Sequence, residues 1–447
     1  MRKSIAFLSL AEKSTGELTY LVSSLNASGA SCNLSRMSVL FVSTQLAHAA
    51  IYFPGMIRHH DHSKSPLKKI NRFLTDCIFK FDIIICIDVN CFILERNLHD
   101  QSLREFYTLF HEQIAAGKKI AFIDYFECFH NQKSDYDAHK ASILSEIRDV
   151  TAGFETESRF SFYVSKFLPK RISSQIQLCP SGTSILRPVP LNFPKAFPGH
   201  RPGIYYYRNC FASDYLIKTS NQKRNFLFAF SKYFENTIDR RLLRKLFIHA
   251  AQGFVRRFSP DEIVVIDPFG CTADQNDIDG TRVTSQLWID KPTLCKIMGE
   301  SYFVALFVPY GTLGTIAIMN GVPFVAVNNS VSSSLSPHVS KIVGDFKLLP
   351  YNALGVLEDH GFFKKLKRQN PYFDAVSFCD LADPCAFDIV HQCILSGTAQ
   401  NKAVLYRQKF SELRLPTLSQ VINECLIVAT DEGSGDDRPR CFSSEDF

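Results

Sequence analysis

The stretch YFVALFVPYGTLGTIAIMNGVPFVAV, residues 302–327, decides the fold that the sequence predicts. It begins with an apolar run at 302–308 and, after a turn rich in glycine and threonine, resumes with the apolar segment 316–320. Gly321 follows where the C-terminal end of a short helix favours glycine, and a second apolar, β-branched run starts at Pro323. The stretch therefore predicts a strand, a glycine turn, a short helix and another strand.

The turn within this stretch is typical of a phosphate-binding site. Its small and polar residues are Gly311, Thr312, Gly314 and Thr315. Such residues leave backbone N–H groups open to an anion at the positive end of a helix. The spacing is neither that of a Walker loop, which needs a lysine after the second glycine, nor G-x-G-x-x-G. An ordinary strand-to-helix turn is the alternative interpretation.

This layout resembles the nucleotide-sugar site of the GT-B glycosyltransferases and of the related sugar-nucleotide 2-epimerases. In those proteins a turn of glycine, serine and threonine binds the donor diphosphate, and the helix after it ends in G-x-P before the next strand. The matching residues here are Gly311, Thr312, Gly314, Thr315, Gly321 and Pro323. Many relatives carry a carboxylate in the helix, where this chain has Ile316, Ala317 and Ile318. Ribose recognition by that carboxylate is therefore not carried over.

The resemblance also implies where the rest of the donor lies. Trp288 and its neighbours follow the strand whose backbone would hold the base, and Ser231 and Lys232 end the first strand of the same half. Lys232 is suited to neutralise a diphosphate as a mobile point charge, although a solvated lysine is the alternative. The predicted donor-binding residues are Ser231, Lys232, Trp288, Ile289, Asp290, Tyr310, Gly311, Thr312, Leu313, Gly314 and Thr315.

A general base is expected near the acceptor, because an inverting transferase needs Asp, Glu or His within reach of the acceptor hydroxyl. Two apolar runs that predict central strands end in Asp88 and Asp124, on the rim where we also expect the loop that holds Glu17. Asp124 ranks first, before Glu17 and Asp88, and His130 is a further candidate. Each acid has an alternative role: Glu17 as a partner of a helix N-terminus, and the two aspartates as caps of their own turns.

Strands alternate with helices along both halves, which predicts an α/β protein with two Rossmann-like, doubly wound parallel sheets. The resemblance implies a GT-B-like arrangement with an interdomain cleft. We expect an N-terminal acceptor domain at 1–187, a proline-rich linker at 188–203, a C-terminal donor domain at 204–400, helices at 401–429 that cross back to the first domain, and a disordered acidic tail at 430–447.

Composition limits the protein class. The 447 residues suffice for two domains, and 46% hydrophobic content with 39 phenylalanines excludes disorder for most of the chain. A net charge of +6 suits anionic small molecules at least as well as nucleic acid. The 14 cysteines include no C-x-x-C pair, which indicates free thiols, and no apolar run approaches the ~20 residues of a membrane helix. We therefore expect a soluble, cytoplasmic protein.

Two further motifs could indicate binding sites, but each has a simpler interpretation. The run His59-His60-Asp61-His62 could supply metal ligands, but adjacent residues rarely converge on one ion, which favours a solvated loop. The basic helix expected at 238–258 could bind nucleic acid or a membrane, but acids nearby favour a solvated face or an oligomer contact.

The expected function is metal-independent transfer of a sugar from a nucleotide-diphosphate donor to an acceptor that the sequence does not identify. Helix-end dipoles would replace a cation, so neither a metal nor a cofactor is expected beside the nucleotide sugar. A homo-oligomer is compatible with the sequence, whereas a nucleic-acid partner is not expected. The alternatives are a sugar-nucleotide epimerase or hydrolase on the same fold, and a catalytically inactive binding or assembly protein.

Overall fold

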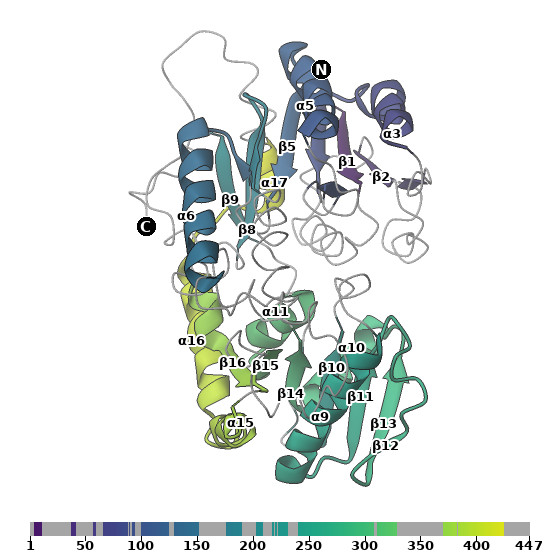
Figure 1. The fold of residues 1–447 in the computed structure, drawn as a ribbon, viewed down its shortest axis with the longest axis vertical. Coiled ribbons are helices and arrows are strands. Elements are labelled where there is room, and N and C mark those ends of the chain that lie inside the picture. The colour runs from purple at the N-terminus through teal and green to yellow at the C-terminus, as the bar shows by residue number, and fades with distance from the viewer. Residues whose placement is uncertain are drawn as a thin grey trace. The chain divides into compact units, whose positions relative to one another are not determined.

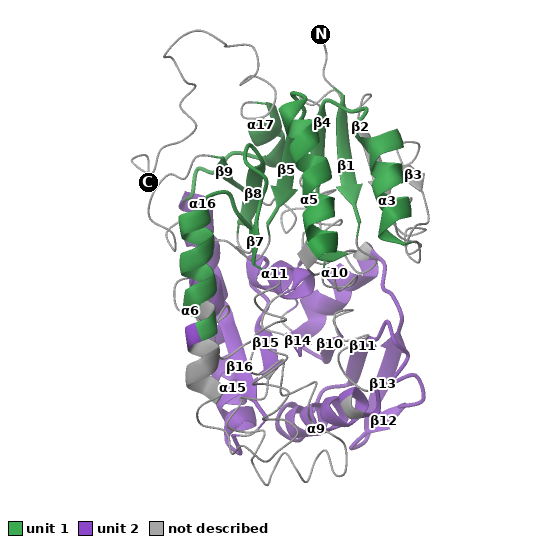
Figure 2. Cartoon of the chain, turned by 45° about the horizontal axis from the view of Figure 1, so that its top comes forward, with its two compact units in different colours: residues 1–144, 170–211, 413–447 green, residues 145–169, 212–412 purple. Residues whose placement is uncertain are grey.

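The computed structural model describes two compact units. Its described residues are 4–10, 37–41, 57–59, 66–87, 89, 92–93, 100–124, 129–151, 176–189, 203–208, 217–218, 220, 222–230, 240–307, 311–328, 370–381 and 383–423. The first unit combines Met1–Leu144, Lys170–Phe211 and Leu413–Phe447, and the second combines Ser145–Pro169 and Ala212–Glu412 (Figure 2). The chain thus leaves the first unit after Leu144 and again after Phe211, and it rejoins that unit at Lys170 and at Leu413.

The described part of the first unit contains a seven-stranded sheet in the order β3-β2-β1-β4-β5-β8-β9. All neighbouring strands in it run parallel. The strands are β1 (Ile5–Ser9), β2 (Met37–Phe41), β3 (Ile57–His59), β4 (Ile83–Cys86), β5 (Lys119–Ile123), β8 (Ser184–Val189) and β9 (Ile204–Arg208), and a separate parallel pair joins β6 (Phe129–His130) to β7 (Gln177–Leu178). The helical segments are α3 (Leu67–Phe73), the π-helix η3 (Leu74–Ile78), α5 (Asp100–Ala115), α6 (Lys133–Thr151) and α17 (Leu418–Val421). From Ser145 onward, α6 is assigned to the second unit.

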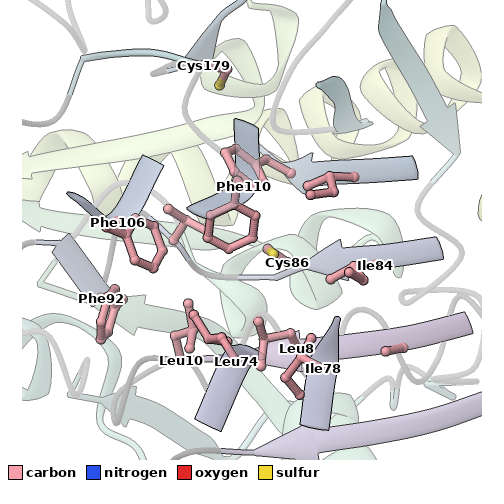
Figure 3. Close-up of a cluster of buried hydrophobic side chains, with 14 of the residues drawn as sticks. Leu8, Leu10, Leu74, Ile78, Ile84, Cys86, Phe92, Phe106, Phe110 and Cys179 are labelled. Carbon is pink, nitrogen blue, oxygen red and sulfur yellow. The ribbon is translucent and has the colours of Figure 1, made fainter. Parts of the chain in front are cut away.

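Aliphatic and aromatic side chains pack together in the core of the first unit (Figure 3). Phe106 and Phe110 on α5 have ring centroids 4.9 Å apart, and Phe110 meets Phe122 of β5 edge to face at 5.6 Å. Successive residues of β4 point to opposite faces of the sheet, yet Ile83 and Ile84 are both fully buried. Both faces of the sheet are therefore covered, which explains why its central strands are continuously apolar in sequence.

The described part of the second unit contains a seven-stranded sheet in the order β12-β13-β11-β10-β14-β15-β16, in which only the edge strand β12 is antiparallel. Its strands are β10 (Asn225–Ala229), β11 (Glu262–Ile266), β12 (Asp277–Ile278), β13 (Thr281–Gln286), β14 (Ser301–Leu306), β15 (Phe324–Asn328) and β16 (Val376–Asp380). The helices are α9 (Arg240–Phe258), α10 (Lys291–Glu300), α11 (Thr312–Met319), the 3-10 helix η8 (Pro371–Ala375), α15 (Ala386–Leu395) and α16 (Thr398–Glu412) (Figure 1). The predicted fold class, two Rossmann-like doubly wound parallel sheets, is confirmed.

The order of the parallel strands places one topological switch point in each sheet, where the direction of winding reverses. In the second unit the chain winds outward in one direction from β10 through β11 to β13, and then restarts on the other side of β10 with β14. The first unit does the same, since β4 lies on the opposite side of β1 from β2. Ligands of such sheets bind beyond the carboxyl ends of the two strands at this switch point. Those strands are β10 and β14 in the second unit.

Two expected boundaries are wrong. The proline-rich segment 188–203 does not begin a linker, because β8 extends to Val189, and 204–208 form β9 beside it rather than opening the second domain. Pro188 is tolerated because β5 pairs with β8 only as far as Leu186, beyond which β9 is the only described strand beside β8. Helix α16 belongs to the second unit, and the return to the first unit begins at Leu413 rather than at 401.

The described part of the chain contains no candidate membrane span. No helix within the described ranges is long and apolar enough to cross a bilayer. The cysteines whose side chains the structure describes are free thiols: Cys86, Cys179, Cys271, Cys295, Cys379, Cys385 and Cys393.

Candidate functional site

The α11 turn, residues 311–315, follows β14 at the switch point of the second sheet. Ala229, the last residue of β10, pairs with Leu306, the last residue of β14, so the two strands end side by side. Gly311 is the N-cap of α11, and its φ of 152° is one that other residues rarely adopt. A Cβ at Gly311 would also lie 3.3 Å from a methyl carbon of Leu306. This position therefore requires glycine.

Helix α11 begins earlier than the sequence suggested, at Thr312 instead of residue 316. The glycine and threonine residues are thus the first turn of the helix. The N–H groups of Thr312, Leu313 and Gly314 have no carbonyl four residues back within the helix to accept from them. Gly311 carries no side chain to cap them, and among the described residues no side chain caps this end of α11. Gly311, Thr312 and Leu313 are half-buried, which leaves part of this turn at the surface.

Two of the predicted donor-binding residues face the interior. The N–H and the hydroxyl of Thr315 both donate to the carbonyl oxygen of Gly311, at 3.0 and 3.1 Å, and Thr315 is only 1% exposed. Gly314 packs so closely on Phe324 of β15 that a Cβ would lie 2.7 Å from its ring. The Thr315 hydroxyl and the missing side chain of Gly314 therefore shape the turn and pack it onto the sheet.

The rest of α11 is apolar and enclosed. Ile316, Ala317 and Ile318, which stand where many relatives have a carboxylate, are each exposed by 1% or less. They form part of the core of the second unit. Helix α11 thus offers backbone N–H groups at its start and no acidic side chain along its length.

The segment after β13 combines an exposed ring with a helix cap. Trp288 is 50% exposed, whereas Ile289 is buried. Asp290 is the N-cap of α10: one oxygen accepts the N–H of Thr293 at 3.0 Å, and the other accepts its hydroxyl at 2.6 Å. The Thr293 hydroxyl and N–H lower the pKa of the Asp290 carboxyl group. The Asp290 side chain therefore serves α10.

Asp124, the first-ranked candidate base, is fully buried at the end of β5. Its Oδ2 accepts from Nε of Arg187 and from the N–H of Phe129, both at 3.2 Å. Arg187, which is 1% exposed, also donates to the carbonyl oxygen of Phe129 at 3.0 Å and to the hydroxyl of Tyr206 at 3.4 Å. Asp124 is thus the anionic partner in a buried network that joins β5, β6, β8 and β9. Its burial and its ion pair argue against a role as general base.

The other candidate bases either lie outside the described residues or are buried. Glu17 and Asp88 lie outside the described residues, as do Ser231, Lys232 and Tyr310 of the predicted donor site. His130 is 5% exposed, and its Nε2 lies 2.8 Å from Nδ1 of His139 on α6. Within the described residues, no group of three or more His, Cys, Asp and Glu side chains is arranged to hold a metal ion.

Four arginines of the basic helix α9 bind partners within the second unit. Arg244, Arg256 and Arg257 pair with Asp274, Asp279 and Asp388 at 2.8, 3.1 and 2.7 Å, respectively. Arg240 donates to the carbonyl oxygen of Phe269 at 3.3 Å. These pairs favour the solvated-face interpretation of the helix over a nucleic-acid site.

Sequence reasoning missed two buried residues, Arg187 and Tyr372. Arg187 was missed because the prolines that follow it suggested a linker and not a strand. Tyr372, on η8, is fully buried; burial raises the pKa of its hydroxyl, and the Thr315 side chain lowers that pKa in part. No sequence signal links it to the α11 turn, because the contact is made only by the fold.

No protein-family model matches the sequence, and no curated protein matches it. Solved structures do match over nearly the whole chain. A putative UDP-N-acetylglucosamine 2-epimerase from Listeria monocytogenes is similar with a TM-score of 0.51 and 11% identity, over 99% of this chain and 100% of that one. Os79 from O. sativa, solved in complex with UDP, also has a TM-score of 0.51, with 10% identity over 94% of this chain and 99% of that one.

This chain has a GT-B-like fold. The resemblance to the GT-B glycosyltransferases and sugar-nucleotide 2-epimerases that the α11 stretch indicated is confirmed at the level of the fold. A GT-B-like chain carries two sheets of this kind, and the α11 turn lies at the switch point of the second.

Proposed function

We propose that this protein is a glycosyltransferase that transfers a sugar from a nucleoside-diphosphate donor to an acceptor. The donor diphosphate binds at the half-buried start of α11, where the N–H groups of Thr312, Leu313 and Gly314 point out of the helix end. The single observation that carries the proposal is the position of this uncapped glycine turn, at the switch point of a doubly wound sheet. The similar fold of Os79, solved with UDP, supports it.

The α11 turn would contribute to the reaction by stabilising charge. As the bond between the sugar and the diphosphate breaks, negative charge accumulates on the leaving nucleoside diphosphate, and fixed N–H groups stabilise it without a metal ion or cofactor. Lys232, two residues after the last described residue of the β10 segment, would add a positive charge at the same switch point. The exposed ring of Trp288, after β13, would lie on the side of the base, with Ile289 and Asp290 contributing backbone.

The general base would take the proton of the acceptor hydroxyl as that oxygen attacks the anomeric carbon. Burial of Asp124 leaves Glu17 and Asp88 as the better candidates. They follow β1 and β4, which are the switch-point strands of the first sheet. Conversion of each to its amide, Glu17→Gln and Asp88→Asn, tests them through turnover at saturating donor.

A sugar-nucleotide epimerase or hydrolase is the second candidate, and the equally similar fold of the putative 2-epimerase from Listeria monocytogenes supports it. Such an enzyme processes the nucleotide sugar without an acceptor. Incubation with nucleotide sugars alone separates the two, because a transferase needs an acceptor for turnover. Nucleotide binding without turnover under either condition would instead indicate an inactive binding or assembly protein.

A thermal-shift screen with UDP, GDP, ADP and TDP tests the donor site. A ligand that binds only the native state at about 100 times its Kd adds roughly 2.7 kcal/mol of stability. We expect at least one nucleotide to raise the melting temperature. Absence of a shift with all four would contradict the donor-site assignment.

Substitution of Thr312 then locates the site. Thr312→Glu places a carboxylate at the N-terminal end of α11, where negative charge favours the helix but repels a diphosphate. We expect unchanged or slightly higher stability without ligand and about tenfold or more weaker nucleotide binding. The neutral control of equal size, Thr312→Gln, should bind much more tightly than Thr312→Glu. Equal affinity of the two variants would place the diphosphate elsewhere.

A further inference from the structure

Helices α10 and α11 lie on the same face of the second sheet. α10 connects β13 to β14 and α11 connects β14 to β15, so both connections advance in the same direction along the strand order. Right-handed crossovers in one direction place their helices on one face, and both helices contact β14. Each helix begins at the carboxyl edge of the sheet and ends at the opposite edge. Their N-terminal ends therefore lie at the proposed donor site, where α10 follows Trp288 and α11 carries the diphosphate turn.

The far end of α10 is capped by the segment through which the chain re-enters the second unit. That unit resumes at residue 212, and the next described residues, 217–218, 220 and 222–224, are called the entry segment here. The N–H of Ser220 and Nζ of Lys223 both donate to the carbonyl oxygen of Gly299, at 2.9 Å each. The N–H of Arg224 donates to the carbonyl oxygen of Glu300 at 2.8 Å. The last carbonyls of a helix have no acceptor role within it, so the entry segment satisfies two of them.

The entry segment also contacts the far end of α11. The N–H of Ile217 donates to Oδ1 of Asn320, the C-cap of α11, at 3.4 Å. Its neighbour Lys218 packs so closely on α10 that a Cβ at Gly299 would overlap the carbonyl oxygen of Lys218. Two adjacent residues of the entry segment thus contact the ends of both helices, and the absence of a side chain at Gly299 permits this approach.

The two helices carry this constraint to the opposite edge of the sheet. α10 has 10 residues and α11 has 8, which makes them about 15 and 12 Å long. β13 and β14, which precede them, are separated by β11 and β10, so their carboxyl ends lie roughly 14 Å apart. A nucleotide that contacts both the loop after β13 and the turn after β14 must span this separation. Its affinity therefore depends on how the two helices are held.

We propose that the entry segment positions α10 against α11, and thereby sets the separation between the loop that takes the base and the turn that takes the diphosphate. The inference rests on the proposed function. Gly299 and Lys223 are the positioning residues, because one admits the entry segment at α10 and the other binds it there. Neither touches the nucleotide, since Gly299 lies at the opposite end of α10 from Trp288.

The test compares a ligand that reaches the base side with one that does not. Gly299→Ala displaces Lys218, and we expect it to weaken binding of the tightest of UDP, GDP, ADP and TDP about five- to tenfold in calorimetric titrations. Binding of inorganic diphosphate, which contacts only the α11 turn, should change less than about twofold. The fluorescence of Trp288, the only tryptophan of the chain, should also respond less to saturating nucleotide than it does in the wild type.

Two further variants support this comparison. Gly253→Ala is the matched control, because its Cβ would overlap the ring of Phe387 on α15. Gly253 lies on α9, which connects β10 to β11 in the opposite direction and so lies on the other face of the sheet. It should lower stability and leave the ratio of the two affinities unchanged. Lys223→Met removes the bond to Gly299 without a clash, so it serves if Gly299→Ala does not fold, and it should shift the ratio about two- to threefold in the same direction.

Three results would overturn the inference and leave the proposed function standing. The first is an unchanged ratio of affinities in folded Gly299→Ala, or in Lys223→Met if Gly299→Ala does not fold. The second is an equal loss of affinity for nucleotide and inorganic diphosphate, as a merely destabilised turn would give. The third is a wild type that binds nucleotide but not inorganic diphosphate at millimolar concentrations, because the two parts of the site would then not be separable. If the wild type binds none of the four nucleotides, the proposed function itself fails, and this inference fails with it.

Discussion

At the scale of single residues, two small features define the α11 turn. Gly311 adopts a φ of 152°, and Gly314 lies against the ring of Phe324. The sequence indicated that both glycines matter, because they follow an apolar strand and precede an apolar helix. It did not distinguish their roles: one permits the backbone turn, and the other permits contact between helix and sheet. Bulky substitutions at either position would disturb folding, so Thr312 is the better site for testing binding.

Asp124 shows how an acid at a strand end can be misinterpreted. Its position after an apolar strand was predicted correctly, but its partner lies on β8, a strand that the sequence did not reveal. Removal of one partner from a buried ion pair leaves an uncompensated charge, which costs about 3–5 kcal/mol. We predict a loss of that size for Asp124→Ala in urea unfolding.

The control for this prediction replaces both partners. Asp124→Leu combined with Arg187→Met buries no charge, and it should retain clearly more stability than Asp124→Ala. A loss well below 1 kcal/mol in Asp124→Ala would contradict the structural role assigned here to the pair.

At the scale of elements, the basic helix α9 and the helix α15 are joined by one ion pair. Nε and Nη2 of Arg257 donate to the two oxygens of Asp388 at 2.7 and 2.8 Å, and the guanidinium lies 5.5 Å from the ring centroid of Phe387. The sequence showed the arginines of α9 but not their acidic partners, which are far away along the chain. A basic helix seen without its partners suggested nucleic acid as one alternative.

This pair predicts a dependence of stability on pH. Hydrogen bonds from Arg257 lower the pKa of Asp388 below its ordinary value of 3.8. Because the pKa is lower in the folded protein than in the unfolded one, ionised Asp388 stabilises the fold above that ordinary value, and this stabilisation is lost as the pH falls through the lowered value. The stability difference between the wild type and Asp388→Asn should be present at neutral pH and shrink below about pH 4. Urea unfolding across this range measures it, and a difference that stays constant down to about pH 2 would contradict the pairing.

The strands that the sequence predicted well are those with uninterrupted apolar runs. The apolar runs that end in Asp88 and Asp124 and the run at 302–308 correspond to β4, β5 and β14, because burial on both faces leaves a local signal. β8 and β9 were missed because Pro188 suggested a linker, although β5 no longer pairs with β8 at that point. β16 also escaped prediction. Pairing partners and chain returns are set by distant residues, which a local pattern does not contain.

At the scale of the whole molecule, the return of the chain to the first unit is a feature that strand patterns could not place accurately. The N–H of Arg208 on β9 donates to the carbonyl oxygen of Pro416 at 2.8 Å, and α17 packs against β9. Leu418 of α17 is fully buried. The last described residues are therefore part of the first unit's structure, although residues 212–412 of the second unit precede them.

This connection predicts which strands a core substitution in α17 destabilises. Leu418→Ala should cost about 2–5 kcal/mol and should speed hydrogen exchange in β8 and β9 while leaving β14 and β15 protected. The matched control, Val325→Ala at a fully buried position of β15, should produce the opposite pattern. Faster exchange in β14 and β15 as the first effect of Leu418→Ala would contradict the assignment of residues 413–423 to the first unit.

The central claim is that the N–H groups at the start of α11 bind the diphosphate of a nucleotide. A crystal structure with the nucleoside diphosphate that stabilises the protein most would test it directly. We predict phosphate oxygens within about 3.2 Å of the backbone nitrogens of residues 312–314. A nucleotide bound with its phosphates away from α11 would contradict the claim.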